Sequence, residues 1–246
     1  MKSFSKILVI GFLTCVLNAC YSGFDSNGGC LVGKGDITTE ERTFESPIQN
    51  IYSNILGVVH IVQGNEEKVT IKAQPNIIAR IKTTYVNNEL RLEVQNQACL
   101  NNTQVDIYVT TPTIQRVTQS GQGEIRSEGV WKMADMELIT HGSGQINAEV
   151  ECTDLKVQIN DYSKIVLKGK TQNQEIDISG YSEYQAYDLV SNNATVNLQG
   201  SGIVGVWASQ QLNATIRGNG CVLYKGSPTI TQNISGGGVI HPVDTN

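Results

Sequence analysis

The stretch LITHGSGQINAEVE (Leu138–Glu151) places a small Gly-Ser-Gly turn between two segments in which apolar and polar residues alternate. Similar turns recur in ISGYSEYQAYD, LQGSGIVGVWA and IRGNGCVLYKG. Alternation with a period of two is typical of a strand with one buried face. The stretch therefore predicts one unit of a repeat, in which a tight turn joins two strands. The units begin their turns at Gly121, Gly142, Asp161, Gly180, Gly200, Gly218 and Gly236.

The spacing of these turns, 18 to 21 residues, predicts how the units assemble. A unit of two strands cannot bury its apolar row alone, so copies must stack. We therefore predict an all-β fold, a single-stranded parallel β-helix of 18–21 residues per coil. The alternative is an antiparallel meander or sandwich with evenly spaced hairpins. Equivalent positions keep their residue type, which favours the β-helix; one such column is Thr140, Ile159, Ile178, Leu198, Ile216 and Ile234.

The first 19 residues have the pattern of a secretory signal peptide. Lys2 and Lys6 precede the apolar run Ile7–Leu17, which is too short to span a bilayer comfortably. Leu17-Asn18-Ala19-Cys20 resembles a bacterial lipobox, which predicts a lipid on Cys20 and, by resemblance to known sorting rules, the outer membrane. Residues 20–35 would then be the lipidated cysteine and a flexible tether. The alternative is an ordinary signal peptide with Cys20 as a spare thiol.

Removal of this leader makes the chain more acidic. The whole chain has 18 Lys and Arg against 23 Asp and Glu; loss of Lys2 and Lys6 leaves 16 against 23, a formal net charge of −7. No cluster of basic residues offsets this charge, so nucleic acid is not an expected partner.

An irregular β region precedes the repeats. We predict that residues 36–118 cover the open end of the solenoid, since an uncovered rung would expose an unpaired strand edge, and that residues 119–246 form the coils. Asn87-Asn88 is a hairpin signal. The strand candidates in this region are 57–62, 68–73, 78–85, 89–94 and 104–110.

Two of the six cysteines, Cys15 and Cys20, belong to the leader and its lipidation site. The other four lack metal or redox spacing. Cys152 and Cys221 are separated by several coils, well over about 10 Å at about 4.8 Å per rung, so they should not pair. A disulfide between Cys30 and Cys99 stays open at this point.

Four aromatic residues are candidates for ligand contact. Tyr187 and Trp207 share an offset of seven from their turn residues and should be stacked neighbours. Tyr162 and Tyr181 share an offset of one. Aromatic rings in register could form a stripe that binds sugar or protein. The alternative is that they only shield the ladder or cap a corner.

The order of these features resembles a known family. The segments FESPIQNIYSNILGVVHIVQGNEEKVTIKAQPNI (44–77) and TPTIQRVTQSGQGEI (111–125), followed by Ser-Gly-x-Gly coils that include Gly144–Asn147, are similar to the head GIN domain family of adhesins from Bacteroidetes-type bacteria. The resemblance covers about residues 41–241. It implies a β-helical lipoprotein or secreted module, and it supplies no catalytic residues. Whether the chain faces the periplasm or the cell surface stays open at this point.

A catalytic site is not evident in the sequence. His60, His141 and His241 occur singly, without the spacing of a metal site or a nucleophile pair, and are expected to be surface or turn residues. The residues Asp154, Asp161, Asp177 and Asp188 have different offsets and form no column. We therefore expect no cofactor and no metal.

Two functions remain open. The first is a non-catalytic envelope lipoprotein that presents a rigid surface to a polysaccharide or to an envelope or host protein. The second is a lyase or hydrolase that cleaves polysaccharides on the same scaffold.

Overall fold

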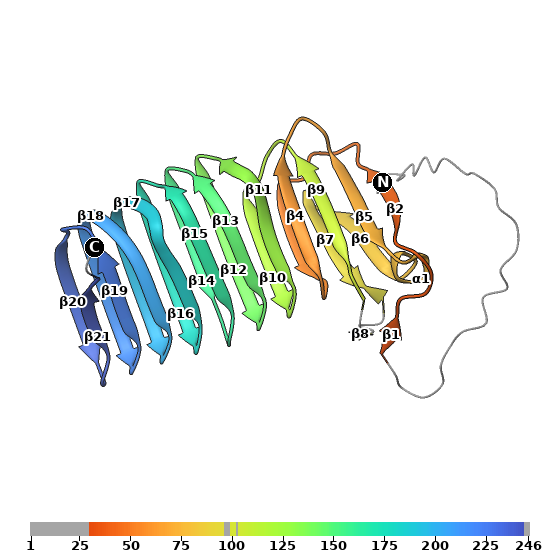
Figure 1. Ribbon diagram of the computed structural model, residues 1–246. Coiled ribbons are helices and arrows are strands. Elements are labelled where there is room, and N and C mark those ends of the chain that lie inside the picture. Colours follow the sequence, from red (N-terminus) through yellow and green to blue (C-terminus); the bar gives the residue numbers. More distant parts are fainter. Residues whose placement is uncertain (1–29, 96–98, 102, 244–246) are drawn as a thin grey trace, which may run out of the picture.

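The computed structural model describes residues 30–95, 99–101 and 103–243 of the 246. The predicted signal peptide, the lipidation site Cys20 and the start of the tether lie outside the described residues. Strand accounts for 70% of the structure and helix for 2%. The strands stack along one axis as successive coils, which confirms the parallel β-helix (Figure 1). Of the helices that the described residues form, none has the length and hydrophobicity of a membrane-spanning segment.

Each coil contributes one strand to each of two opposed faces. The first face contains β10, β12, β14, β16 and β20, and the second contains β11, β13, β15, β19 and β21. Strands β17 and β18 turn the corner and belong to both. The bounds are β10 Arg116–Gly121, β11 Glu124–Lys132, β12 Asp135–Gly142, β13 Gln145–Glu151, β14 Asp154–Ile159, β15 Lys164–Lys170, β16 Asn173–Gly180, β17 Glu183–Gly200, β18 Ile203–Gly218, β19 Cys221–Lys225, β20 Thr229–Ser235 and β21 Val239–Pro242.

The register between coils is the one that the repeat predicts. The strand pairings bring the six members of the predicted column from Thr140 to Ile234 next to one another in sequence order. From Thr140 to Ile216 the column is buried, with exposed fractions of 0 to 3%. The interior of the coil is therefore the hydrophobic core, and each coil completes the burial of the one before it.

Two further coils extend the stack beyond the predicted range 119–246. Strands β3 (Asn50–Asn54) and β4 (Val58–Gln63) pair in parallel with β10 and β11. Strands β7 (Glu89–Val94) and β9 (Asp106–Thr111) pair in parallel with the other edges of β3 and β4. The coil of β7 and β9 follows that of β3 and β4 in the sequence but lies outside it in the stack. The spacing of the turns does not predict this reversed order.

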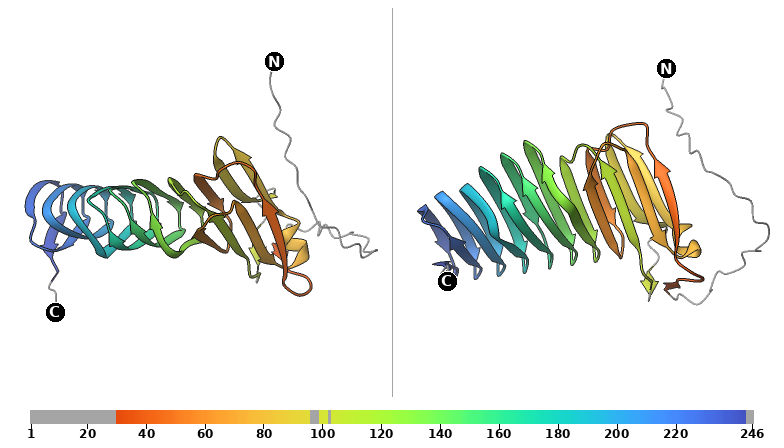
Figure 2. Two further views of the ribbon diagram at one scale, coloured as in Figure 1. Left: turned by 90° about the horizontal axis from the view of Figure 1, so that it is seen from above. Right: turned by 45° about the horizontal axis from the view of Figure 1, so that its top comes forward.

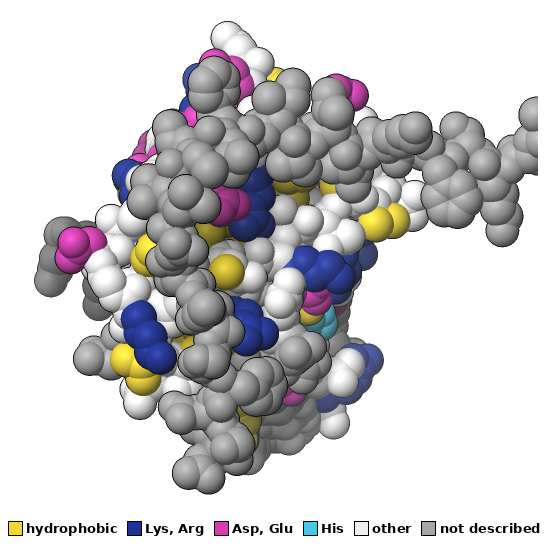
Figure 3. All heavy atoms as spheres, turned by 90° about the vertical axis from the view of Figure 1, so that its right-hand side faces the viewer, with side chains coloured by type: hydrophobic (Ala, Val, Ile, Leu, Met, Phe, Trp, Pro, Cys, Tyr) yellow, Lys and Arg dark blue, Asp and Glu magenta, His cyan; other side chains and the backbone are white. Residues whose placement is uncertain are grey.

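Antiparallel strands close this end of the stack (Figure 2). β5 (Lys68–Ala73) pairs with β9, β2 (Thr38–Thr43) pairs with β5, and β6 (Ile81–Val86) pairs with β7. Asn87 and Asn88, both with positive φ, form the predicted hairpin turn between β6 and β7. Residues 75–78, the last of them predicted to begin a strand, form the short helix α1 (Pro75–Ile78). Charged side chains of both signs lie on this end (Figure 3).

A disulfide joins Cys30 to Cys99 in the N-terminal region. Cys30 and Cys99 are bonded, with a Cα–Cα distance of 4.7 Å, next to the short parallel pair β1 (Leu31–Val32) and β8 (Leu100–Asn101). Cys152 and Cys221 are free, as predicted. The pairing left open by the sequence is therefore decided, and the closed loop spans 69 residues.

The turn glycines stack directly on one another. Gly200 has φ +117°, and a Cβ there would lie 2.6 Å from the carbonyl oxygen of Gly180 in the preceding coil. Both the backbone conformation and the contact between coils therefore require glycine. Gly129, in the bulge of β11, has φ +91°, but a Cβ at this residue would have open space within 4 Å.

We expect Gly200→Ala to lower the free energy of unfolding by about 2–4 kcal/mol, because it combines the positive-φ penalty with a backbone clash. Gly129→Ala should lose only the positive-φ part, about 1–2 kcal/mol. Urea denaturation of the two variants measures the difference. Equal losses would show that contact between stacked glycines does not constrain the turn.

We expect the chain from residue 21 onward to expose two thiols when unfolded without reductant and four after reduction, as counted with a thiol-reactive dye. In the native protein both free thiols should react more slowly than free cysteine at pH 8, because burial raises the pKa of Cys152 and of Cys221 and leaves less thiolate. Four thiols before reduction would contradict the disulfide.

Candidate binding surface

An aromatic–lysine cluster, formed by Tyr187, Trp207 and Lys225, lies on the outer side of the second face. The Lys225 ammonium is 5.8 Å from the centroid of each ring, within cation–π range. Trp207 pairs in register with Lys225 of the next coil. Both rings and the lysine are partly exposed. The cluster therefore offers two aromatic side chains and one cation to solvent.

The fold holds Tyr187 by a local irregularity. Register between β17 and β18 shifts after Ala186, and pairing resumes with Val190 opposite Trp207. The Tyr187 ring lies over Gly205, where a Cβ would approach the ring to 2.3 Å. Partial burial raises the pKa of Tyr187, so its phenol stays neutral at physiological pH. Gly205 thus provides the flat space on the sheet that the ring covers.

A buried polar network fixes the backbone at Trp207. Tyr184, fully buried inside the coil, donates to Gln174 Oε1 at 2.9 Å, and Gln174 donates to Ser191 Oγ at 2.8 Å. Ser191 in turn donates to the Trp207 carbonyl at 2.6 Å. Burial raises the pKa of Tyr184, which keeps it a donor. The core therefore positions the strand that carries the indole.

The prediction that Tyr187 and Trp207 are stacked neighbours is wrong. Trp207 lies beside Val190 and Lys225, whereas Tyr187 lies over Gly205. Beyond the register shift, residues with equal offsets from their turns are no longer paired, because Tyr187–Leu189 are additional residues in this coil with no partner in β18. Lys225 was not predicted, although it has the same offset of seven from Gly218 and the sequence could have revealed it.

The second predicted pair is confirmed as a stack. The Tyr162 and Tyr181 rings are 6.0 Å apart between centroids and inclined by 7°. They are 71% and 68% exposed, in the turns before β15 and β17. Tyr181 lies in the turn before β17 and Tyr187 lies six residues further along the chain, about 20 Å away at about 3.3 Å per residue. The four aromatic residues therefore form two separate sites.

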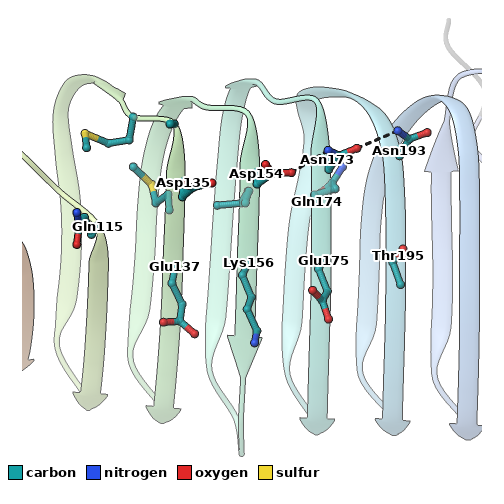
Figure 4. Close-up of a pocket in the computed structure, with 14 residues that line it drawn as sticks. Gln115, Asp135, Glu137, Asp154, Lys156, Asn173, Gln174, Glu175, Asn193 and Thr195 are labelled. Carbon is teal, nitrogen blue, oxygen red and sulfur yellow. Dashed lines mark hydrogen bonds between the residues drawn. The ribbon is translucent and has the colours of Figure 1, made fainter.

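A groove of about 940 Å³ runs along the corner of the first face. An amide and carboxylate ladder crosses its coils: Asn193 donates to Asn173 Oδ1 at 2.9 Å, and Asn173 donates to Asp154 Oδ1 at 2.8 Å (Figure 4). Glu137 is paired with Arg116 at 2.5 Å. These carboxylates are engaged in contacts between coils, which is a structural role. The ladder positions share an offset of seven before each turn, a regularity from which the ladder could have been predicted.

His60 is not the isolated surface residue that we predicted. It lies on the outer side of β4, stacked on Tyr108 with centroids 4.4 Å apart. Its Nδ1 is 2.6 Å from Glu128 and its Nε2 is 3.3 Å from Asp106. Register alone brings these four residues together from β4, β9 and β11. In the part of the chain that the structure describes, no group of three or more His, Cys, Asp or Glu side chains is arranged to hold a metal ion.

Residues 50–228 match the model of a family described as "Putative auto-transporter adhesin, head GIN domain". The chain belongs to this head GIN domain family. The matched residues run from β3 to just after β19, so they include both binding-surface candidates and most of the stack. The resemblance read from the sequence is thereby confirmed. No protein of curated function matches the chain.

Solved structures share the fold of this head GIN domain protein. A putative adhesin from Bacteroides fragilis superposes with a TM-score of 0.81 at 23% identity, covering 87% of this chain and 100% of the other. A putative lipid binding protein from Parabacteroides distasonis gives 0.72 at 20% identity, covering 87% and 99%. A putative adhesin from Parabacteroides merdae gives 0.68 at 17% identity, with the same coverage. At these identities the likeness concerns the fold.

Proposed function

We propose that this head GIN domain protein is a non-catalytic adhesin of the cell envelope, held by a lipid on Cys20, that binds glycans through the aromatic–lysine cluster. Family membership supports the adhesin class. The observation that carries the glycan specificity is the Tyr187 ring laid flat over Gly205, with the Trp207 ring within reach of the same Lys225 ammonium. Flat rings on a rigid sheet offer apolar faces on which the C–H faces of a sugar ring can stack.

The charges around the cluster and on the whole chain favour a neutral or weakly acidic glycan as the ligand. Lys225 lies 3.7 Å from Asp188, so its charge is partly balanced within the cluster. The formal net charge of −7 without the leader disfavours strongly anionic polymers. Ile203, 45% exposed, and Leu223 extend the apolar surface around the rings. A hexose or N-acetylhexosamine chain suits this surface, with hydroxyl groups placed to accept from Lys225.

We expect the double variant Tyr187→Ala, Trp207→Ala to weaken glycan retention at least tenfold, about 1.4 kcal/mol, since both stacking surfaces are lost. The measurement is affinity electrophoresis of residues 21–246 in gels containing a mannan, a β-glucan or mucin glycopeptides. The matched control, Tyr162→Ala with Tyr181→Ala, removes two exposed rings at the other site. Unchanged retention of the first variant, or an equal loss of retention in both variants, would show that the aromatic–lysine cluster is not the glycan-binding site.

Lipidation is tested separately in cells. We expect the full chain to incorporate labelled fatty acid and to fractionate with membranes, and Cys20→Ser to lose both properties, because the acylated thiol is absent. A protease added to intact cells should then degrade the wild-type protein, since an adhesin must face outward. A protein that is labelled but protected from the protease would contradict the adhesin function.

A further inference from the structure

The two ends of the solenoid are finished differently. The N-terminal end is closed by antiparallel strands, but within the described residues β20 and β21 pair on one side only, with β18 and β19. Ile230 and Ile234 continue the columns of Leu212 and Ile216, which are fully buried, yet each is 37% exposed. The last coil therefore presents a cross-section of the hydrophobic core together with free backbone groups.

This terminal coil carries no charge. Residues 226–243 contain no Lys, Arg, Asp or Glu, in a chain that is 17% charged. Natural proteins usually protect such an edge with charged residues, proline or a covering segment. Pro242 removes one donor from β21, but β20 has no comparable protection. In an acidic protein, a neutral patch is also where two copies can approach with least repulsion.

Strand β20 is close to symmetric about Gln232. It reads Thr-Ile-Thr-Gln-Asn-Ile-Ser. If a second copy pairs antiparallel with Gln232 opposite Gln232, Ile230 lies opposite Ile234 of the second copy, and Thr231 lies opposite Asn233. Apolar residues then meet apolar residues, and polar residues meet polar ones. The cores of the two solenoids become continuous across the junction.

The free backbone groups suit the same register. Asn193, in the column of Thr229, donates its N–H to the Gln172 carbonyl of the preceding coil. The backbone N–H and C=O groups of successive residues point to opposite edges of a strand. Those of residues 229, 231, 233 and 235 therefore point toward β18, and those of residues 230, 232 and 234 point toward the free edge. Pairing centred on Gln232 joins residue 232 with 232, and 230 with 234. Every free N–H and C=O from 230 to 234 then has a partner.

We propose that the protein forms an end-to-end homodimer in which β20 pairs antiparallel with β20 of a second copy around a two-fold axis at Gln232. If this two-fold axis is normal to the two faces of the solenoid, the same rotation also places β21 opposite β21 of the second copy. The N-terminal cap lies at the far end of each solenoid (Figure 1). The dimer thus carries its two N-terminal caps at opposite ends, which suits contact between two cells; only this consequence rests on the proposed function.

The interface is small. Strands β20 and β21 have seven and four residues, against roughly 20–30 residues per partner in a standard interface. We therefore expect a reversible dimer with Kd of about 1–100 μM, rather than a permanent one.

A charge exchange at the axis tests the pairing. Only a residue on the two-fold axis lies opposite itself, so Gln232→Lys and Gln232→Glu should each place like charges together and weaken dimerisation at least tenfold. A one-to-one mixture of the two variants should dimerise again, because Lys then lies opposite Glu. Sedimentation velocity of residues 21–246 at increasing concentration measures all three samples. Thr215→Lys, on the outer side of β18 one coil inward, is the control and should dimerise as wild type does.

Thermal melting of each variant establishes that the coil is folded. A wild-type protein that stays monomeric up to about 100 μM, a concentration near the weak end of the expected Kd range, would overturn the proposal. So would dimerisation of both single variants, or a mixture that stays monomeric. None of these outcomes bears on glycan retention, so the dimer and the aromatic–lysine cluster succeed or fail independently.

Discussion

Hydrogen bonding between successive coils, strand upon strand in one register, is the constraint on which the rest of this structure depends. A parallel ladder places each residue directly above its counterpart about 4.8 Å away. Each interior position is therefore buried only if its neighbours above and below are of compatible size and polarity. The column from Thr140 to Ile216 satisfies this requirement through five coils. Stability is thus shared between adjacent coils, as in other solenoids.

The same constraint explains the turns and the two ends. Stacked turns bring backbone onto backbone, as at Gly200 above Gly180, where a side chain has no room. A ladder must also stop, and each stop leaves free backbone groups. At the N-terminal end, β2, β5 and β6 reverse direction and cover the outer coil, and the Cys30–Cys99 disulfide lies next to the short pair β1 and β8. The neutral coil of β20 and β21 lacks such a cover within the described residues.

Departures from strict register create the features that distinguish one coil from another. The shift in β17 frees Tyr187 to lie across Gly205 and leaves Trp207 beside Lys225. A polar network through Tyr184, Gln174 and Ser191 replaces apolar packing inside the same coil. Buried polar groups of this kind fix a geometry only when all are bonded. The binding-surface candidate therefore rests on the least regular part of the repeat.

The amino-acid sequence was enough to predict the parallel β-helix, the length of its coils, the interior columns and the Tyr162–Tyr181 stack, because all of these follow from counting residues from a repeated turn. Other features depend on contacts between strands that counting cannot locate. The coil 89–111 lies outside the coil 50–63, since sheet pairing and not chain order sets the stack. His60 meets Asp106 and Glu128 across three strands that are far apart in sequence. Tyr187 leaves the Trp207 column because inserted length shifts the register locally, and only the pairing of strands shows where that length is accommodated.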